Sequence, residues 1–279
     1  VLGARPQFIK AAAVSRAIKS HEDIEEVIIH TGQHFDANMS DIFFDQLDIL
    51  EPQHNLHISG LSHGAMTGRM IEGIEGLIQQ ENPDWVLVYG DTNSTLAGAL
   101  AAAKLHVPVV HVEAGLRSHN SAMPEEINRV LTDRVATVLL CPTETAVHNL
   151  KHEGFPFPAT GANKVQQKQR IENIGDVMYD AVLYYRDLAR ERVCLEDYSL
   201  QHQGYALCTL HRQENTDDPA RLNSILNALR TIAQDLPVVL PLHPRTKAKL
   251  AQLNNRSTLN GLTLLEPLPY LEMQRLQMS

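Results

Sequence analysis

Short apolar segments that lead into acidic residues constrain the fold of this chain more than any other feature. Residues 85–89 and 107–112 form two such segments, and they are followed by Asp91 and Glu113. A helix-length stretch of small residues separates the two segments. Strands that alternate with helices build parallel sheets, in which ligands bind at the carboxyl ends of the strands. The sequence therefore predicts that Asp91 and Glu113 lie where the chemistry takes place.

The same alternation runs through the rest of the chain and predicts two sheets. Strands are expected at 26–31, 85–89, 107–112 and 136–141, then at 205–210, 238–242 and 262–265. Helices are expected at 8–19, 39–47, 62–80, from about 94, and at 143–152, 176–190, 219–234, 247–253 and 269–277. Residues 155–170 are rich in Pro, Gly, Lys and Gln without periodicity, so we expect domains at 1–170 and 171–279. The predicted class is α/β, with two doubly wound parallel sheets.

Composition narrows the classes of partner. The chain has 279 residues, 43% of them hydrophobic, which is enough to bury a substantial core. A formal net charge of -9 provides no basic surface for nucleic acid or an anionic membrane, so neither is expected as a partner. No run approaches the roughly 20 apolar residues of a membrane span. The three widely spaced cysteines indicate a reducing compartment, and a cytoplasmic location is expected.

Two basic residues near the start of the sequence predict an anion site. Pro6 suits the first turn of a helix, where its missing N–H has no cost. The free N–H groups of that turn, flanked by Arg5 and Lys10, suit a diphosphate. The sequence contains neither GxGxxG nor GxxxxGK[ST], so neither motif supports binding of NAD or hydrolysis of ATP.

Polar residues follow the expected strands in both halves of the chain, where residues 1–2 are expected to end a first strand. The sets are 3–5, 31–34, 90–92, 113–115, 211–215 and 243–245. Any one of them has a simple alternative explanation as a helix cap or a solvated loop. Six sets at equivalent places predict a cleft between two domains, with carboxylates on one side and His and Arg on both.

Two of these features have further alternative explanations. His111 and Glu113 share one face of a strand, which would suit a metal, but no HxH or HExxH motif accompanies them. We therefore expect a core histidine that is hydrogen-bonded within the sheet, and no metal. Glu125 lies four residues before Arg129, and Glu126 lies three before it, so a surface ion pair is as good an explanation as a functional role.

Several motifs together resemble a known family. They are GARPQFIK at 3–10, TGQH at 31–34, GDT at 90–92, HVEAGLR at 111–117, PEEINR at 124–129, GDVMYD at 175–180 and HRQEN at 211–215. In this order and over almost the whole chain, they are similar to the non-hydrolysing UDP-N-acetylglucosamine 2-epimerases. The resemblance implies a GT-B fold of two Rossmann-like domains, a homodimer, and a UDP-sugar substrate bound in the interdomain cleft. It also implies a role in supplying precursors of cell-surface polysaccharide.

The resemblance implies a mechanism without a cofactor. Members of the family remove the C2 proton while UDP leaves C1, and UDP then adds back as C2 is protonated on the opposite face. The residues that match the catalytic carboxylates are Asp91, Glu113 and Glu125, and His211 matches the histidine near the diphosphate. Those that match UDP-binding or supporting positions are Arg5, Lys10 and Arg129. Those that match an activator site for a second UDP-sugar are Gln33, Arg69 and His243, whereas Asp36 departs from the Gln found in activated members.

The resemblance leaves the sugar open. The opening GARPQFIKA, the GDTNST motif and the short loop before Pro124 are closer to relatives that act on UDP-2,3-diacetamido-2,3-dideoxyglucuronate. The DSGG-containing nucleotide motif of the family does not occur, so we expect an incomplete second domain and a sequence that is part of a longer protein. The alternatives are a glycosyltransferase or hydrolysing relative, a metal-dependent phosphoesterase, and a binding module without turnover.

Overall fold

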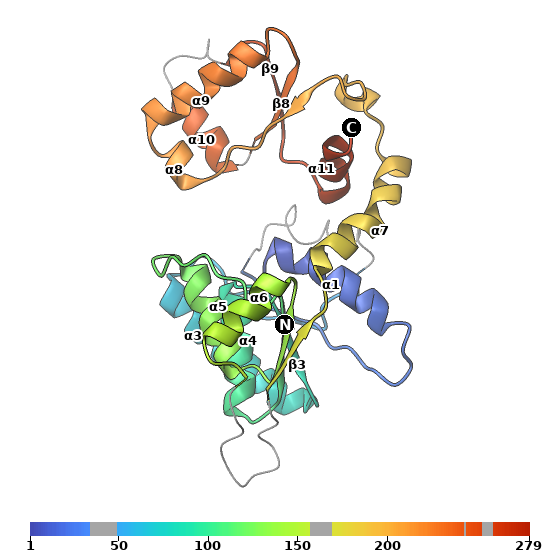
Figure 1. Cartoon of the computed structure of the whole chain (residues 1–279), viewed down its shortest axis with the longest axis vertical. Coiled ribbons are helices and arrows are strands. Elements are labelled where there is room, and N and C mark those ends of the chain that lie inside the picture. The colour runs from blue at the N-terminus through green and yellow to red at the C-terminus, as the bar shows by residue number, and fades with distance from the viewer. Residues whose placement is uncertain (34–48, 157–168, 243, 253–258) are drawn as a thin grey trace. The chain divides into compact units, whose positions relative to one another are not determined.

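The computed structural model describes residues 1–33, 49–156, 169–242, 244–252 and 259–279 (Figure 1). The chain divides into two compact units, Val1–Leu183 and Tyr184–Ser279. The helix expected at 39–47 and most of the segment expected to separate the domains lie outside the described residues.

Parallel strands form the centre of the first unit. A four-stranded sheet has the order β3-β4-β5-β6, with β3 at Val86–Tyr89, β4 at Val109–Val112, β5 at Val138–Cys141 and β6 at Arg170–Asn173. A second parallel pair contains β1 at Ile29–His30 and β2 at His54–Asn55, and Leu2 forms a parallel bridge with His30. Because β6 pairs with β5, the first unit extends past residue 170.

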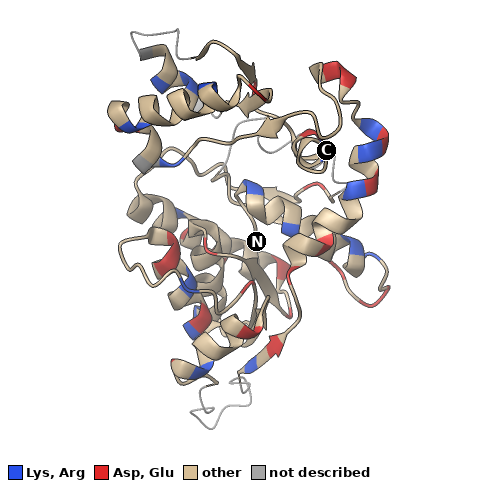
Figure 2. Ribbon diagram, turned by 45° about the horizontal axis from the view of Figure 1, so that its top comes forward, with Lys and Arg blue, Asp and Glu red and all other residues tan. Residues whose placement is uncertain are grey.

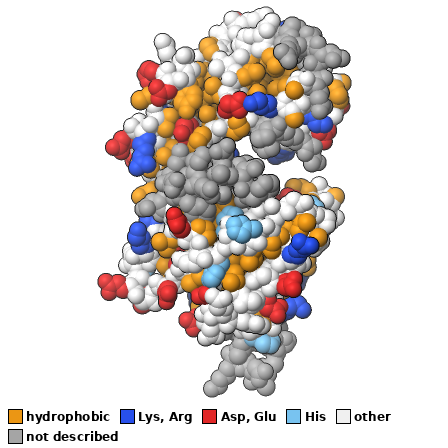
Figure 3. Space-filling view, turned by 180° about the vertical axis from the view of Figure 1, so that it is seen from behind, with side chains coloured by type: hydrophobic (Ala, Val, Ile, Leu, Met, Phe, Trp, Pro, Cys, Tyr) orange, Lys and Arg blue, Asp and Glu red, His pale blue; other side chains and the backbone are white. Residues whose placement is uncertain are grey.

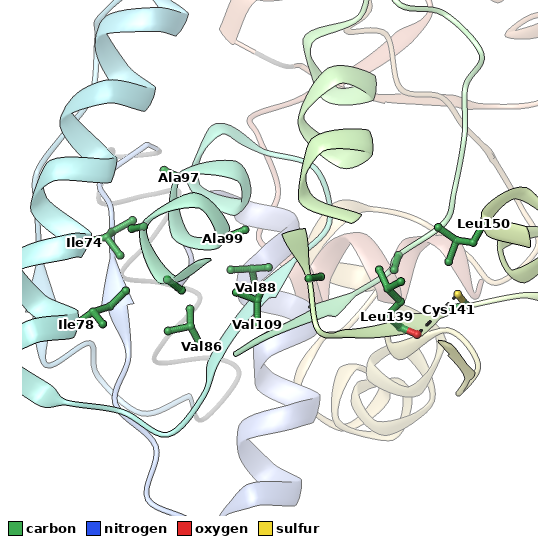
Figure 4. Close-up of a cluster of buried hydrophobic side chains, with 14 of the residues drawn as sticks. Ile74, Ile78, Val86, Val88, Ala97, Ala99, Val109, Leu139, Cys141 and Leu150 are labelled. Atoms are coloured by element: carbon green, nitrogen blue, oxygen red, sulfur yellow. Dashed lines mark hydrogen bonds between the residues drawn. The ribbon is translucent and has the colours of Figure 1, made fainter. Parts of the chain in front are cut away.

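Helix α4 lies at the centre of the helical layer on this sheet. The helices of the first unit are α1 at Arg5–Ile18, α3 at His63–Glu81, α4 at Asn93–Lys104, α5 at Pro124–Val135 and α6 at Glu144–His152. Helix α4 packs against α3, α5 and β3. Four of its alanines, Ala97, Ala99, Ala101 and Ala102, are fully buried, and their small side chains let the neighbouring helices approach closely. Ile74 and Ile78 of α3 and the valines of β3 complete this part of the core (Figure 4).

The second unit repeats the parallel arrangement on a smaller scale. Its sheet has the order β7-β8-β9, with β7 at Ala206–Leu207, β8 at Val238–Pro241 and β9 at Leu262–Leu265. Its helices are α8 at Gln213–Thr216, α9 at Pro219–Ile232, α10 at Pro244–Gln252 and α11 at Tyr270–Gln277, and a short 3₁₀ turn lies at Glu196–Tyr198. The division between the units falls within α7, Val177–Arg192. Buried leucines such as Leu222, Leu226 and Leu240 form the core of the second unit.

Local sequence signals explain where several elements begin. Pro6 lies in the first turn of α1, as expected, and the hydroxyl of Thr92 accepts from the backbone N–H of Thr95 at the start of α4. Asp218 caps α9 in the same way. Strands β1 and β7 are shorter than expected, and β2 and β6 were not expected. The sequence of β6, RIEN, is polar because three of its four residues are exposed, so it has no apolar run to mark it.

Charge is distributed over both units. Acidic and basic residues are interspersed along the ribbon (Figure 2). The face in Figure 3 shows charged side chains of both signs scattered among hydrophobic ones. Within the described ranges, no helix is both long enough and apolar enough to span a membrane.

Candidate active site

Asp91 lies in the turn between β3 and α4. Gly90 takes a φ of +65° there, which a glycine adopts without strain. Gln7 of α1 holds both sides of the turn. Its side-chain amide donates to the carbonyl of Tyr89 at 2.9 Å and to the hydroxyl of Thr95 at 3.0 Å. Helix α1 therefore positions the end of β3, and with it Asp91.

Glu113 follows β4 directly and has an unusual backbone conformation. Its φ is +72°, in a region that side-chain-bearing residues rarely occupy. Its N–H donates to the carbonyl of Leu140 at 3.0 Å, and its own carbonyl accepts a hydrogen bond from Arg129 Nη1. Such strain persists only where surrounding contacts hold it, and it is most frequent at functional sites.

Asp91 and Glu113 meet two cations in one cluster. Arg129 Nη2 lies 2.5 Å from Asp91 Oδ2 and 3.0 Å from Glu113 Oε1, and Lys10 Nζ pairs with Glu113 Oε2. The two cations are almost fully buried, whereas the side chains of Asp91 and Glu113 are 31% and 18% exposed. We call these four residues the open cluster.

Charge in the open cluster shifts the pKa of Glu113 and of Arg129. Burial opposes ionisation of Glu113, but Lys10 and Arg129 outweigh it, so the pKa of Glu113 is lowered and the group is ionised at neutral pH. For Arg129, burial is outweighed by Asp91 and Glu113, so its pKa is raised. The cluster therefore holds a negatively charged Glu113 beside Asp91, at a place that a proton can reach from solvent.

Helix α5 brings much of the site together. Asn128 Nδ2 donates to the backbone carbonyl of Asp91 at 2.9 Å and to Asn93 Oδ1 at 3.2 Å. Arg129 pairs with Asp91 and Glu113, so the alternative in which it forms a surface pair with Glu125 or Glu126 is wrong. The Glu126 carboxylate instead accepts from the backbone N–H groups of residues 118 and 119 and orders the loop before the helix.

A second cluster of charged side chains is buried at three of its four residues, and its fourth, Glu153, is 28% exposed. His111 Nδ1 lies 2.7 Å from Asp133 Oδ1, and Arg117 Nη1 lies 2.8 Å from Asp133 Oδ2. Arg117 also forms a two-pronged pair with Glu153, at 2.7 and 2.9 Å. The expectation that His111 is a hydrogen-bonded core histidine is confirmed. We call His111, Asp133, Arg117 and Glu153 the closed cluster.

The remaining expected site residues lie elsewhere. Glu125 is exposed in the first turn of α5 and does not join the open cluster. Arg5 is half-buried at the first residue of α1, and burial lowers its pKa. His211 is exposed in the second unit, just before α8.

Two of the three residues that match the activator site are described. Gln33 Oε1 accepts from the N–H and hydroxyl of Ser94 at 3.2 and 2.9 Å, at the start of α4. Arg69 is exposed on α3. His243 lies outside the described residues, as does Asp36.

Sequence reasoning missed Gln7 and Asp133. From sequence, Gln7 resembles an ordinary surface residue of a helix. Only its position directly after Pro6, in the first turn of that helix, indicates that it lies near a strand end. Asp133 lies four residues after Arg129, so it continues the face of α5 that carries the expected site residues, and that spacing was the available signal. Among the described residues, no group of three or more His, Cys, Asp or Glu side chains is arranged to hold a metal ion.

Comparison with known proteins identifies the family. A profile described as UDP-N-acetylglucosamine 2-epimerase matches residues 16–279. The chain belongs to this family. A UDP-2,3-diacetamido-2,3-dideoxy-D-glucuronate 2-epimerase of Pseudomonas aeruginosa is 53% identical over 98% of the chain and 73% of that protein. A UDP-N-acetylglucosamine 2-epimerase of Methanocaldococcus jannaschii is 39% identical over 99% of the chain and 75% of that protein.

Solved structures of UDP-N-acetylglucosamine 2-epimerases share the fold. The Methanocaldococcus jannaschii enzyme in complex with UDP-GlcNAc and UDP matches with a TM-score of 0.82 and 40% identity, over 98% of this chain and 74% of that one. The Neisseria meningitidis enzyme bound to UDP-GlcNAc matches with a TM-score of 0.83 and 28% identity, over 99% and 73%. The fold class expected from the sequence, an α/β fold of GT-B type with parallel sheets, is confirmed.

Proposed function

We propose that this chain catalyses epimerisation at C2 of a UDP-N-acetylated sugar. The observation that carries the proposal is the open cluster, in which Arg129 holds Asp91 and Glu113 together in a member of the 2-epimerase family. Two carboxylates at one site can remove a proton and return one, as inversion of a carbon requires. Lys10 and Arg129 provide positive charge for a departing diphosphate.

The reaction proceeds by elimination and re-addition and requires no cofactor. A carboxylate takes the proton from C2, the C2–H electron pair forms the C1=C2 double bond, and UDP leaves with the electron pair of the C1–O bond. The products of this half-reaction are a 2-acetamidoglycal and UDP. UDP then adds back to C1 while an acid protonates C2 from the opposite face, and atoms and charge balance over the cycle.

The ion pairs of the open cluster also provide a way to activate the base. Lys10 and Arg129 lower the pKa of Glu113, which makes it a weak base while they remain paired with it. A diphosphate competes for the same two cations. When it takes them, the pKa of Glu113 rises and the carboxylate becomes a stronger base. Glu113 is therefore assigned as a base that binding of the nucleotide strengthens.

The other expected residues keep their proposed roles. Glu125 is the third carboxylate, Arg5 contacts UDP, and His211 acts near the diphosphate. The first domain supplies the carboxylates, and the second domain binds the nucleotide.

Replacing His211 with Asn is expected to lower kcat, and an unchanged kcat would show that His211 has no role in the site. A sigmoidal dependence of rate on substrate, lost in a Gln33→Ala variant, would establish the activator site with Arg69 and His243.

The similarity data favour one sugar. The relative that shares 53% identity is named for UDP-2,3-diacetamido-2,3-dideoxy-D-glucuronate, and the matched relatives named for UDP-N-acetylglucosamine share 47%, 39% or 32%. We propose the diacetamido glucuronate as the first substrate to test and UDP-GlcNAc, converted to UDP-ManNAc, as the second. Incubation with each and analysis of the products decides between them. Release of free sugar or formation of a glycoside would instead indicate a hydrolysing relative or a glycosyltransferase.

Isotope exchange tests the mechanism. In heavy water and without added cofactor, the complete protein is expected to place deuterium at C2 of recovered substrate and product. Retention of protium at C2 during turnover would contradict elimination. A Glu72→Gln variant serves as the control, because Glu72 is an exposed residue of α3 and belongs to none of the motifs that carry the catalytic carboxylates.

We also propose a homodimer. An apolar stripe on α5 is left uncovered. It consists of three residues spaced four apart, Met123 at the start of the helix and Ile127 and Leu131 within it, which are 40%, 48% and 44% exposed. Light scattering after size exclusion is expected to give twice the mass of one chain, and Ile127→Asp to weaken the association. A monomeric wild type would contradict this. The free thiols of Cys141, Cys194 and Cys208 support a cytoplasmic location.

A further inference from the structure

A single buried carboxylate joins the two loops that carry Asp91 and Glu113. Asp133 is on α5, one turn after Arg129, and has no exposed surface. Its Oδ1 contacts His111 Nδ1, and its Oδ2 accepts from the backbone N–H of Gly115 at 3.2 Å and from Arg117 Nη1 at 2.8 Å. Asp133 therefore fixes strand β4 and the loop that directly follows Glu113.

His111 extends this connection to the other loop. Its Nε2 lies 2.7 Å from the backbone carbonyl of Gly90, the residue before Asp91. The N–H of Gly90 in turn donates to the carbonyl of Val112 at 3.0 Å. The turn that carries Asp91 is thus held to β4 both through the backbone and through the His111 ring.

The partners of His111 determine its protonation. One ring nitrogen faces a backbone carbonyl and the other faces a carboxylate, and both of these groups accept hydrogen bonds. A neutral imidazole has one N–H and would leave one acceptor unpaired in a site with no exposed surface, which is costly. Burial opposes ionisation of Asp133, but His111 and Arg117 lower its pKa overall, so Asp133 is held as a carboxylate that accepts from the ring.

We propose that His111, as a buried imidazolium, and Asp133 together form a positioning pair for the proposed epimerisation. The pair touches neither the sugar nor the nucleotide. It sets the distance between the Asp91 turn and the Glu113 loop from behind, while Asn128 and Arg129 hold the same two loops from the front. The kinetic consequence rests on the proposed function, but the protonation state does not.

Nuclear magnetic resonance tests the protonation state directly. In the complete, ligand-free protein at neutral pH, the side-chain ¹⁵N resonances of His111 are expected to show both ring nitrogens protonated. The signal is assigned by its loss in a His111→Gln variant. A ring with one unprotonated nitrogen would overturn the assignment, whether or not the protein proves to be an epimerase.

Kinetics tests the positioning role. In His111→Gln, the amide cannot donate to both Gly90 and Asp133, so kcat is expected to fall by on the order of 10²-fold with KM unchanged, because misplaced catalytic groups slow the chemical step. An unchanged kcat, or a loss confined to KM, would overturn the proposal. If that variant does not fold, Asp133→Asn provides the second measurement.

Asp133→Asn separates position from charge. The introduced amide can donate to Nδ1 of a neutral His111, which still donates to Gly90 through Nε2. The oxygen of that amide can still accept from Gly115 and Arg117. This variant is expected to keep more of kcat than His111→Gln and to show an unprotonated Nδ1 by ¹⁵N resonance. A loss of kcat as large as that of His111→Gln, with the ring still doubly protonated, would contradict the positioning role.

Discussion

The open and closed clusters have the same composition of charge, but the carboxylate at the centre of the closed cluster is fully buried and neither carboxylate of the open cluster is. Each contains two carboxylates and two cationic groups, and each is anchored to α5, by Arg129 in one case and Asp133 in the other. Asp91 is 31% exposed at the side chain, whereas Asp133 and His111 are fully buried. The closed cluster therefore holds the loops in place, and the open cluster offers similar charges to a ligand.

The difference in access decides what each charge can do. A buried pair gains strong attraction but cannot exchange its partner without exposing an uncompensated charge. A partly exposed pair can lose a partner to a ligand, because water and the ligand replace it. Lys10 and Arg129 face only carboxylates that solvent reaches, so they can turn to a diphosphate, whereas Arg117 is also held by the fully buried Asp133.

The largest effect is expected from removing the proposed base of the open cluster. Glu113→Gln keeps the shape of the side chain but not its charge, so kcat is expected to fall about 10² to 10⁴-fold. Steady-state kinetics measures this, and Glu72→Gln is the matched control. The thermal midpoint is expected to change less than in variants of Asp133. A kcat near that of wild type would show that Glu113 does not move the proton.

Removing the central carboxylate of the closed cluster is expected to affect folding most. Asp133→Ala leaves the buried His111 without its carboxylate partner and Arg117 with Glu153 alone, at a cost of about 3 to 5 kcal/mol. Urea titration measures this free energy of unfolding. Asp91→Ala, at a partly exposed position, is the matched variant and is expected to cost much less. Equal costs would remove the distinction between the clusters.

The glycines beside the clusters offer a smaller, matched comparison. At Gly115, φ is +78° and an added Cβ would lie 2.5 Å from the carbonyl oxygen of Ala146. Gly115→Ala is therefore expected to destabilise by about 1 to 3 kcal/mol, because rigid backbone must shift. At Gly90 the nearest atom to an added Cβ is Lys10 Nζ, 3.3 Å away at the end of a flexible side chain.

Gly90→Ala is accordingly expected to cost less stability than Gly115→Ala but to disturb the Lys10–Glu113 pair and lower kcat. Urea titration and kinetics on the two variants give four values to compare. A reversed order of stability would indicate that the loop after Glu113 is the more adaptable of the two.

The smallest expected effect concerns acid. The pKa of Glu113 is lowered from its ordinary value of 4.5, so its contribution to stability is complete above that pH and is lost as pH falls through the folded pKa. The stability difference between wild type and Glu113→Gln is therefore expected to shrink as pH falls below about 4.5. Salt is expected to reduce the stability difference between wild type and Glu113→Gln more than the difference between wild type and Asp133→Asn, because exposed charges are screened more.

The order of strands and helices could be predicted from sequence wherever an element carries an apolar face. Strands β3, β4 and β8 contain nearly continuous apolar runs, and α4 is read from its alanines. Strand β6 was not predicted because edge strands bury little, so their sequences lack the periodicity that reveals them.

Residues of the candidate site were predictable where they follow a strand, as Asp91 and Glu113 do, or belong to a motif of the family, as Lys10 and Arg129 do. Asp91, Glu113, Lys10 and Arg129 were named from sequence, and the structure brings them together. Their pairing was not predictable, since Arg129 has two carboxylates one turn away on its own helix and contacts neither. Only the fold shows that this helix faces two strand ends, and that Asp133 takes up the next turn.

The left-handed backbone of Glu113 has a consequence for the thermodynamics of binding. Hydrogen bonds from Glu113 to Leu140 and from Arg129 to Glu113 set the direction of its carboxylate during folding. Such preorganisation leaves little ordering for a ligand to induce in this loop. The entropy change on binding a nucleotide sugar should then come from released water and from the ligand, and not from ordering of this loop. The strain at Glu113 lowers the free energy of unfolding of the chain, and this loss of stability accompanies the preorganisation of the carboxylate.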